Sequence, residues 1–392
     1  MDFLLLSPEV QAFIDKNLHA DFFKLALQKN PFPNMEWTSI LNQIACKSKA
    51  RCKLPTFFQT ANIIYPSKIS LEQTSSEKTA RYKAEVICGN SIIDLTGGFG
   101  VDSVFFAKKF GQVIHCEMND ELSQIAHHNF KALHCKNIET ICGDGLEILK
   151  NKNQKFDWIY VDPSRRNDAK GKVFMLKDSM PNVPDLLSTY LTYGDKILIK
   201  TAPILDINAG ILELKNVKNI QIVAVENEVK ELLWVVEKDY LQGIQINTIN
   251  IICEKIEHFS FNYFGNVDKA NLDFPQKYLY EPNASIMKSG GFDALSFEYN
   301  MAKLHQNSHL YTSNSIKYFP GRAFEIVSTF AYSKTNMNLY LKDIKANVAI
   351  RNFTETVEAL RKKWKIEDGG NIYCFFTTNK NEQKIVIICK KL

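Results

Sequence analysis

The residues most able to do chemistry lie in one short glycine-rich turn, "DLTGGFGVDS". An apolar run ends there in an acid, Asp94, and the turn that follows contains Thr96, Gly97, Gly98 and Gly100. A turn of this kind between a strand and a helix offers backbone N–H groups and a helix N-terminus to a bound ligand. The stretch therefore predicts a binding site for a small, nucleotide-like molecule.

The spacing of the glycines separates two kinds of nucleotide site. Dinucleotide-binding turns carry a third glycine where this chain has Ser103, so the NAD fingerprint fails. The remaining pattern, an acid followed by spaced glycines, fits a nucleoside ligand without a pyrophosphate. We therefore expect S-adenosylmethionine, with the glycine backbone close to its methionine part and Asp94 helping to hold its amino group.

Two further acids stand at the ends of the next two apolar runs. Glu117 lies 23 residues after Asp94, the usual distance for a carboxylate that binds both ribose hydroxyls. Asp144 follows the next run and is placed to accept a hydrogen bond from the adenine amino group. Either acid alone could equally be a helix N-cap. Together with the turn they predict a cofactor site made of Asp94, Thr96, Gly97, Gly98, Gly100, Glu117 and Asp144.

The fourth apolar run ends in "DPSR". Asp162, Pro163, Ser164 and Arg165 would then lie at the carboxyl edge of a parallel sheet, beside the predicted cofactor site. Open α/β sheets bind their ligands at this edge. These four residues are therefore the candidate catalytic motif.

The positions of these residues depend on strand–helix alternation from residue 90 onward. Helical stretches separate apolar runs at 92–95, 112–116, 138–142, 157–161 and 196–199. This rhythm predicts a Rossmann-like α/β fold with five parallel strands and crossover helices. Residues 219–238 hold two apolar runs with only a few polar residues between them. That gap is too short for a crossover and predicts an antiparallel hairpin at the sheet edge.

Over roughly residues 73–255, the combination resembles class I S-adenosylmethionine-dependent methyltransferases. "DPSR" is similar to the Asp/Asn-Pro-Pro-aromatic motif of enzymes that methylate amino groups in nucleic acids. The resemblance implies that the Asp162 side chain and the Pro163 carbonyl accept hydrogen bonds from a target amine and aim its lone pair at the methyl group.

The motif departs from that family at two positions, where Ser164 replaces the second proline and Arg165 replaces the aromatic residue. A guanidinium can also stack on a base or bind a phosphate, so base methylation stays the expectation. The "DPPR" motif of uracil-C5 methyltransferases is also close. Those enzymes need a later nucleophilic cysteine, whereas Cys253, Cys374 and Cys389 lie inside apolar strand patterns.

The C-terminal part resembles the THUMP-like domain that follows a methyltransferase core in one bacterial family, through "IKANVAIRNF" and "ALRKKWKIEDGGNIYCFFTT". Because THUMP domains bind RNA, this resemblance implies an RNA substrate. We divide the chain into four parts: an N-terminal helical region (1–88), a methyltransferase domain (89–255), a connecting segment of ferredoxin-like character (256–321) and a THUMP-like domain (322–392).

Basic residues cluster toward both ends of the chain, which carries a net charge of +5. Such clusters suit a polyanionic partner, although a solvated helix face explains each of them about as well. Trp364 lies within the C-terminal basic cluster and is a candidate for base stacking. The residues expected to contact RNA are Lys47, Lys49, Arg51, Lys53, Arg166, Arg361, Lys362, Lys363 and Lys365.

The composition indicates the cellular compartment in which this protein is expected. No apolar run approaches the roughly 20 residues that a membrane span needs, and the first residues lack signal-peptide features. The nine cysteines are scattered without a CxxC pair, which favours a reducing compartment and a cytoplasmic protein. The histidines show no metal-binding spacing, so no metal is expected. The oligomeric state stays open.

The expected activity is methyl transfer from S-adenosylmethionine to an exocyclic amine of an RNA base, guanine N2 or adenine N6, in tRNA or rRNA. Two alternatives remain at this point. The chain could methylate a protein or a small molecule, or it could be a non-catalytic RNA-binding protein built on the same fold.

Overall fold

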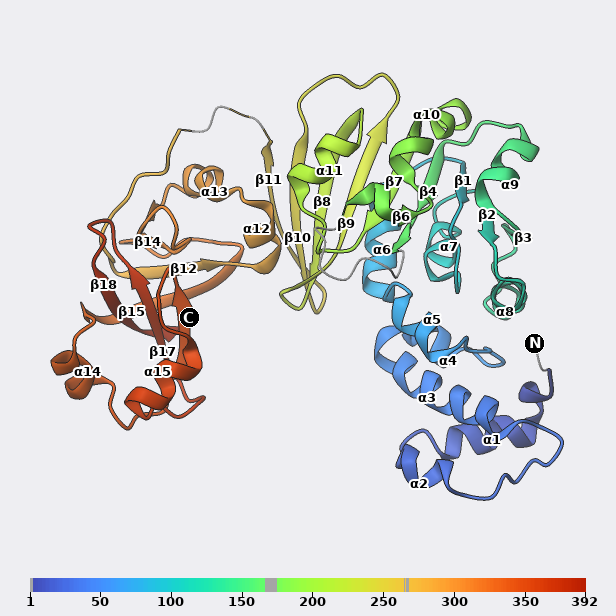
Figure 1. The fold of residues 1–392 in the computed structure, drawn as a ribbon, viewed down its shortest axis with the longest axis horizontal. Helices are drawn as coiled ribbons and strands as arrows, with labels where there is room; N and C mark the ends of the chain where they lie inside the picture. The colour runs from blue at the N-terminus through green and yellow to red at the C-terminus, as the bar shows by residue number, and fades with distance from the viewer. Residues whose placement is uncertain (1–2, 166–174, 264, 266–267) are drawn as a thin grey trace. The chain divides into compact units, whose positions relative to one another are not determined.

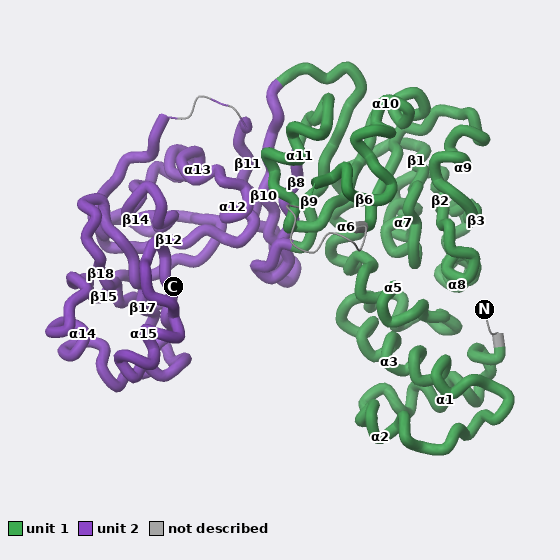
Figure 2. The backbone as a smooth tube through the Cα atoms, viewed as in Figure 1, with its two compact units in different colours: residues 1–219, 230–242 green, residues 220–229, 243–392 purple. Residues whose placement is uncertain are grey.

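The computed structural model describes residues 3–165, 175–263, 265 and 268–392. The chain forms two compact units (Figure 2). The first consists of Met1–Asn219 and Lys230–Gln242, and the second of Ile220–Val229 and Gly243–Leu392. In the described residues, no helix combines the length and the apolar character needed to cross a membrane.

The first unit begins with a helical region, as the sequence predicts. A 3-10 turn (Phe3–Leu6) precedes helices α1 (Pro8–Lys16), α2 (Phe22–Ala26), α3 (Trp37–Lys53), α4 (Pro55–Gln59), α5 (Lys68–Gln73) and α6 (Glu77–Val86). In α3 the buried residues Ile40, Leu41 and Ile44 recur at helical spacing and form its core face. Ser67 caps α5, because its side chain accepts the N–H of Ser70.

A parallel sheet follows (Figure 1), with strands β1 (Ser91–Asp94), β2 (Gln112–Glu117), β3 (Ile138–Cys142), β4 (Trp158–Val161) and β7 (Lys196–Thr201). The strand order in this part is β7-β4-β1-β2-β3. The strand order reverses at β1, which lies between β2 and β4. Open α/β sheets bind ligands at such a reversal, beyond the carboxyl ends of the strands.

Crossover helices connect these strands: α7 (Val101–Phe106), α8 (Asp120–Ala132), α9 (Gly145–Lys152) and α10 (Val183–Tyr193). Shorter elements lie around the "DPSR" motif, namely β5 (Ser164–Arg165), a 3-10 turn (Leu176–Asp178) and β6 (Ser179–Met180). Strands β1 and β4 are buried along most of their length, which is expected of parallel strands covered on both faces. The predicted Rossmann-like fold class is confirmed.

The predicted hairpin is also present. After α11 (Ile207–Glu213), the chain forms β8 (Val217–Val225) and β9 (Glu228–Glu237). Glu226 and Asn227 join the two strands with positive φ angles of 50° and 62°. Positive φ at both central residues is the mark of a type I′ turn, whose twist matches that of the strands. Strand β9 runs antiparallel to β7, with Lys196 opposite Glu237.

The second unit contains an antiparallel pair, β10 (Gln245–Ile252) with β11 (Lys255–Asn262), and a seven-stranded sheet. That sheet has the order β13 (Ala302–Lys303), β14 (Tyr311–Ser313), β12 (Tyr278–Pro282), β15 (Gly321–Ala331), β18 (Lys384–Lys391), β17 (Ile372–Thr378) and β16 (Asn347–Arg351). Helices α12 (Ala284–Ser289), α13 (Phe292–Glu298), α14 (Lys334–Tyr340) and α15 (Val357–Trp364) lie between the strands along the chain.

The core of this C-terminal sheet corrects one expectation about RNA contact. Trp364 is only 8% exposed and packs with Leu360, Phe376 and Val386. Its indole N–H donates to the hydroxyl of Tyr332 at 3.2 Å. Trp364 is therefore a core residue, and its ring is not available to stack on a base.

Candidate active site

The three glycines of the turn have different physical roles. A Cβ on Gly97 would lie 2.1 Å from the ring of His115, and one on Gly100 would lie 2.4 Å from the ring of Phe130. These two glycines are required for packing. Gly98 has a φ of +56°, yet a Cβ there would meet nothing closer than 4.0 Å. Space therefore remains open at Gly98, where a ligand can approach the backbone.

Asp94 ends β1 and is only 1% exposed. One carboxylate oxygen accepts the N–H of Thr96 at 3.1 Å, and the other accepts the hydroxyl of Ser103 at 2.8 Å. Burial raises the pKa of Asp94 to about 8. Ser103, which stands where dinucleotide binders have their third glycine, also lies 3.0 Å from Nδ1 of His115. The missing glycine is thus a serine that fixes the acid of the turn.

Glu117 connects the end of β2 to the same turn. Its Oε2 accepts the N–H of Gly98 at 2.8 Å, and its Oε1 accepts the N–H of Asn119 at 2.8 Å. The fold therefore brings Glu117 directly to the glycine of this turn that has open space around it. Binding of a ribose by Glu117 stays a prediction. Its position beside the turn is the one expected if the turn and Glu117 bind the same ligand.

Asp144 is the N-cap of α9, the alternative that the sequence left open. Its Oδ1 accepts the N–H groups of Leu146 and Glu147 at 2.9 and 3.0 Å. Asp144 is exposed, and the two capping bonds both use Oδ1. Contact with an adenine amino group stays a prediction.

The "DPSR" motif lies next to the glycine turn. The backbone N–H of Asp162 donates to the hydroxyl of Thr96 at 2.7 Å, so the end of β4 is tied to the turn that follows β1. Ser164 and Arg165 form β5, which pairs with β6 through Met180 and Ser179. Pro163 is half-buried between these elements. Arg166 lies outside the described residues.

The carboxylate of Asp162 is not free, which the sequence did not suggest. Its Oδ2 forms an ion pair with Nζ of Lys200, a residue of β7. The register of the sheet explains this contact, because Val161 lies opposite Ile199 in the parallel pair. Asp162 and Lys200 are the next residues on the two strands, so their side chains meet.

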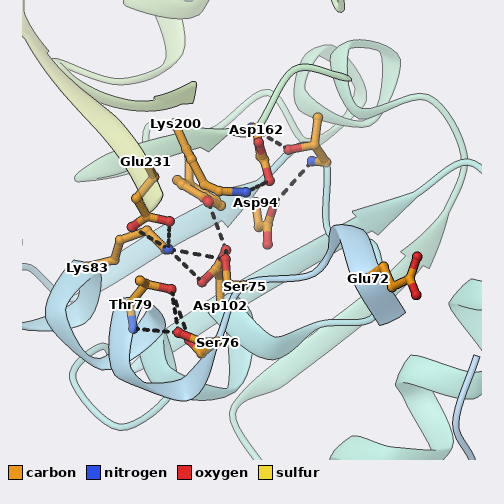
Figure 3. Close-up of polar contacts among 12 residues, drawn as sticks. Glu72, Ser75, Ser76, Thr79, Lys83, Asp94, Asp102, Asp162, Lys200 and Glu231 are labelled. Carbon is orange, nitrogen blue, oxygen red and sulfur yellow. Dashed lines mark hydrogen bonds and ion pairs between the residues drawn. The ribbon is translucent and has the colours of Figure 1, made fainter. Parts of the chain in front are cut away.

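Behind this pair lies a buried cluster of charged side chains (Figure 3). Lys83 of α6 donates to both carboxylate oxygens of Glu231 at 2.8 Å and lies 3.2 Å from a carboxylate oxygen of Asp102. The Asp102 carboxylate also accepts the hydroxyls of Tyr160 and Ser75 at 2.8 Å. Lys83, Asp102 and Glu231 are all less than 9% exposed.

Opposite charges favour the ionised forms of Lys200 and Asp102, whereas burial raises the pKa of Glu231. Burial by itself lowers the pKa of Lys200, but the carboxylates of Asp162 and Asp102 outweigh it and hold the pKa of Lys200 above its ordinary value. Burial likewise raises the pKa of Asp102, and the ammonium groups of Lys83 and Lys200 outweigh it and lower that pKa. Lys200 and Asp102 are therefore charged at neutral pH.

Two residues of this cluster could have been recognised from the sequence as buried charges. Lys200 interrupts the apolar run "KILIKTA", and Glu231 interrupts "VKELLWVV". A charged residue in a buried strand must have a partner, so each predicts a polar contact. Lys83 leaves no such signal, because its helix also carries the exposed basic residues Lys78 and Arg81.

The basic residues of α3, predicted to contact RNA, already have partners within the protein. Lys47 pairs with Asp15 and Lys49 with Glu72, both at 2.5 Å. The other two contacts are Arg51 with the ring of His19 at 3.2 Å, and Lys53 with the backbone carbonyls of Leu71 and Glu72. Contact with RNA stays a prediction for all four residues.

The basic residues of α15 and its end differ among themselves. Arg361 pairs with Asp368 at 2.5 Å, and Lys363 pairs with Glu355 at 3.0 Å. Lys362 and Lys365 are exposed. These two lysines are the best placed of the set to meet a phosphate, and their contact with RNA stays a prediction.

Three family models match separate parts of the chain. A model described as RNA cap guanine-N2 methyltransferase matches residues 89–183, which contain the glycine turn and "DPSR". A ferredoxin-like domain matches residues 278–320, and a THUMP domain-like model matches residues 321–391.

A crystal structure from Porphyromonas gingivalis W83, described as a candidate methyltransferase, is similar over the entire chain. The sequences are 30% identical, the TM-score is 0.89, and the match covers 100% of this chain and 99% of the other. The chain belongs to the class I S-adenosylmethionine-dependent methyltransferases with a C-terminal THUMP-like domain. The resemblance noted in the sequence is confirmed.

The curated relatives match a smaller part of this methyltransferase than the crystal structure does. Proteins from Clostridium tetani and Clostridium acetobutylicum, both described as uncharacterized RNA methyltransferases, are 26% identical over 152 residues and 25% identical over 146 residues. The match covers 38% and 36% of this chain, and 32% and 31% of those proteins. The chain thus spans about a third of the length of the curated relatives it matches.

The buried ion pair predicts a large effect of Lys83 on the stability of the methyltransferase. Replacement of Lys83 by Met leaves Glu231 and Asp102 buried without their ammonium partner, which costs about 3–5 kcal/mol of unfolding free energy. Urea unfolding measures this loss. Lys218→Met is the matched control, because its ion pair with Glu237 is partly exposed and is worth less than about 1 kcal/mol. Equal losses in the two variants would contradict the assignment.

The raised pKa of Asp94 predicts how stability depends on pH. Between the ordinary value of 3.8 and about 8, the folded state binds a proton that the unfolded state has released, so stability falls as pH rises through this range. Asp94→Asn removes the titration and gains stability relative to the wild type from pH 5 to pH 8. Urea unfolding at a series of pH values measures this difference.

Asp157 provides the control for that experiment. Its carboxylate accepts the N–H groups of Ser91 and Asn90, which lowers its pKa. The difference between wild type and Asp157→Asn should therefore stay constant above pH 5. A constant difference for Asp94→Asn as well would show that Asp94 is already ionised in the folded protein.

Proposed function

We propose that this protein transfers the methyl group of S-adenosylmethionine to an exocyclic amine of an RNA base, with guanine N2 as the preferred acceptor. The observation that carries the proposal is the 2.7 Å hydrogen bond from the N–H of Asp162 to the hydroxyl of Thr96. This bond brings together, in one site, the turn that would bind the methyl donor and the motif that would bind the amine.

The donor half of the site consists of the turn and the two acids that follow β2 and β3. Open space at Gly98 fits close approach of a ligand to the backbone. Glu117, bonded to that glycine, is the candidate ligand of the ribose hydroxyls, and Asp144 that of the adenine amino group. Asp94 supports the turn through its hydrogen bonds with Thr96 and Ser103. It is also the candidate to help hold the amino group of the methionine part of the donor. When bound, the donor supplies an electrophilic methyl group.

The acceptor half consists of Asp162 and Pro163. The lone pair of an aromatic amine is delocalised into its ring, so the amine reacts best when its N–H bonds fix its orientation. The Asp162 carboxylate and the Pro163 carbonyl are the proposed acceptors of those bonds. Alignment of this kind contributes through proximity rather than through a strong base. Ser164 and Arg165 follow directly and are the candidates for contact with the base.

Two observations support RNA and guanine as the substrate. The model that matches residues 89–183 is described as acting on guanine N2 of an RNA cap. The C-terminal part matches a THUMP domain-like model, and Lys362 and Lys365 present positive charge on its surface. tRNA and rRNA are the proposed substrates.

One observation favours a second acceptor, the 2′-hydroxyl of an RNA ribose. A hydroxyl is a poor nucleophile until it loses its proton, so its methylation needs an acid–base group close by. The Asp162 carboxylate, paired with Lys200, is the candidate for that group, because the raised pKa of Lys200 keeps the ammonium protonated. The two acceptors give different products, a methylated base or a methylated ribose.

Variants at two glycines test the donor half. Gly98→Ala places a side chain in the open space and should weaken S-adenosylmethionine binding by about 10-fold or more, equivalent to about 1.4 kcal/mol. Titration calorimetry measures this affinity. Gly290→Ala is the matched control, because Gly290 also has a positive φ, +72°, and open surroundings. It imposes the same backbone strain in the other unit. Equal binding by both variants would remove Gly98 from the donor site.

Nucleoside mass spectrometry tests the reaction. Purified protein is incubated with cellular RNA from a strain lacking the gene and with S-adenosylmethionine carrying a deuterated methyl group. We expect labelled N2-methylguanosine or N6-methyladenosine, and a loss of at least about 100-fold in rate for Asp162→Ala with donor binding retained.

Each other outcome of this experiment has a definite meaning. Label on the ribose selects the second acceptor. Donor binding without any labelled RNA contradicts the proposed RNA substrate. Absence of donor binding contradicts catalysis altogether and leaves a non-catalytic RNA-binding protein.

A further inference from the structure

The two oxygens of the Asp162 carboxylate differ in their surroundings. Oδ2 is bound by the ammonium of Lys200, whereas Oδ1 forms no hydrogen bond with any of the described residues. The side chain of Asp162 is 31% exposed, and that of Lys200 is 13% exposed. One oxygen of this partly exposed carboxylate is therefore occupied, and the other has no hydrogen-bond partner among the described residues.

Lys200 is itself held in place by charge. The carboxylates of Asp102 and Glu231 lie close enough to raise its pKa, and both are in contact with Lys83. Figure 3 shows Lys200 pointing at Asp162 from β7, with this cluster beside it. A swing of Lys200 into solvent would take the ammonium away from Asp162 and remove positive charge from beside Asp102 and Glu231, which is costly for partly and fully buried carboxylates. Lys200 thus has a fixed position.

We propose that Lys200 is a positioning residue for methyl transfer: it binds Oδ2 of Asp162 and so presents Oδ1 to the N–H of the acceptor amine. The proposal rests on the proposed amine methylation and assigns Lys200 a role within that site. Rotation of the carboxylate about its χ2 angle would otherwise leave the acceptor oxygen without a fixed direction. A fixed direction matters because small misplacements of reacting groups cost about 100-fold in rate.

The proposal makes an unusual prediction for an amide at position 162. An asparagine side chain has a single oxygen. In Asp162→Asn the ammonium of Lys200 attracts this oxygen. The amide NH2 group then faces the acceptor amine. Two donors then meet and kcat falls by about 100-fold. In the double variant Asp162→Asn/Lys200→Met the oxygen is released to face the amine. We expect kcat to recover by at least about 10-fold over Asp162→Asn alone.

This recovery separates positioning from a structural role. If Lys200 only stabilised the fold, its replacement would add a further loss to that of Asp162→Asn. Lys200→Met alone should lower kcat with little change in the affinity for S-adenosylmethionine, measured by calorimetry. Lys196→Met is the matched control, because Lys196 lies on the same strand at the opposite end from the site. It should keep wild-type kcat.

The outcomes distinguish this proposal from the proposed function. If the wild type labels no RNA base, the amine reaction itself is wrong. If the wild type labels a base and the double variant is no more active than Asp162→Asn, the role of Lys200 is wrong and the reaction stands. Asp162→Asn/Lys200→Ala repeats the test with a shorter side chain, so the result does not depend on the folding of one variant.

Discussion

The site depends on the balance of charges buried where β4, β7 and β9 approach α6 and α7. Lys83 and Lys200 are surrounded by the carboxylates of Asp102, Asp162 and Glu231. A buried charge is tolerated only when its partners are in place. All five elements must therefore take their positions together.

The glycine turn is connected to this cluster through two short contacts. Thr96 accepts the N–H of Asp162, and Tyr160, the residue paired with Asp94 across β1 and β4, donates to Asp102. The glycine turn, the "DPSR" motif and the charged cluster are consequently parts of one arrangement. A displacement of β4 would disturb all three.

Much of this could be predicted from the sequence, because it follows from local patterns. Apolar runs and short gaps predicted the parallel strands and the hairpin, since burial on both faces and connection length dictate them. Glycine spacing predicted the turn. Lys200 as the partner of Asp162 was missed, because that contact depends on the register of β4 against β7. Trp364 was misjudged for a similar reason: basic neighbours along the chain did not reveal that its ring faces the core.

The sequence by itself determined the fold class and the residues at the strand ends, because periodicity and spacing act over short distances along the chain. Its motifs carried the resemblance to the family. Only the tertiary structure decided what those residues contact. It tied Glu117 to Gly98, gave Ser103 the task of holding Asp94, and gave one oxygen of Asp162 to Lys200. These contacts join residues that lie between 9 and 38 positions apart. They form because parallel strands bring their carboxyl ends to one edge, where buried polar groups must find partners.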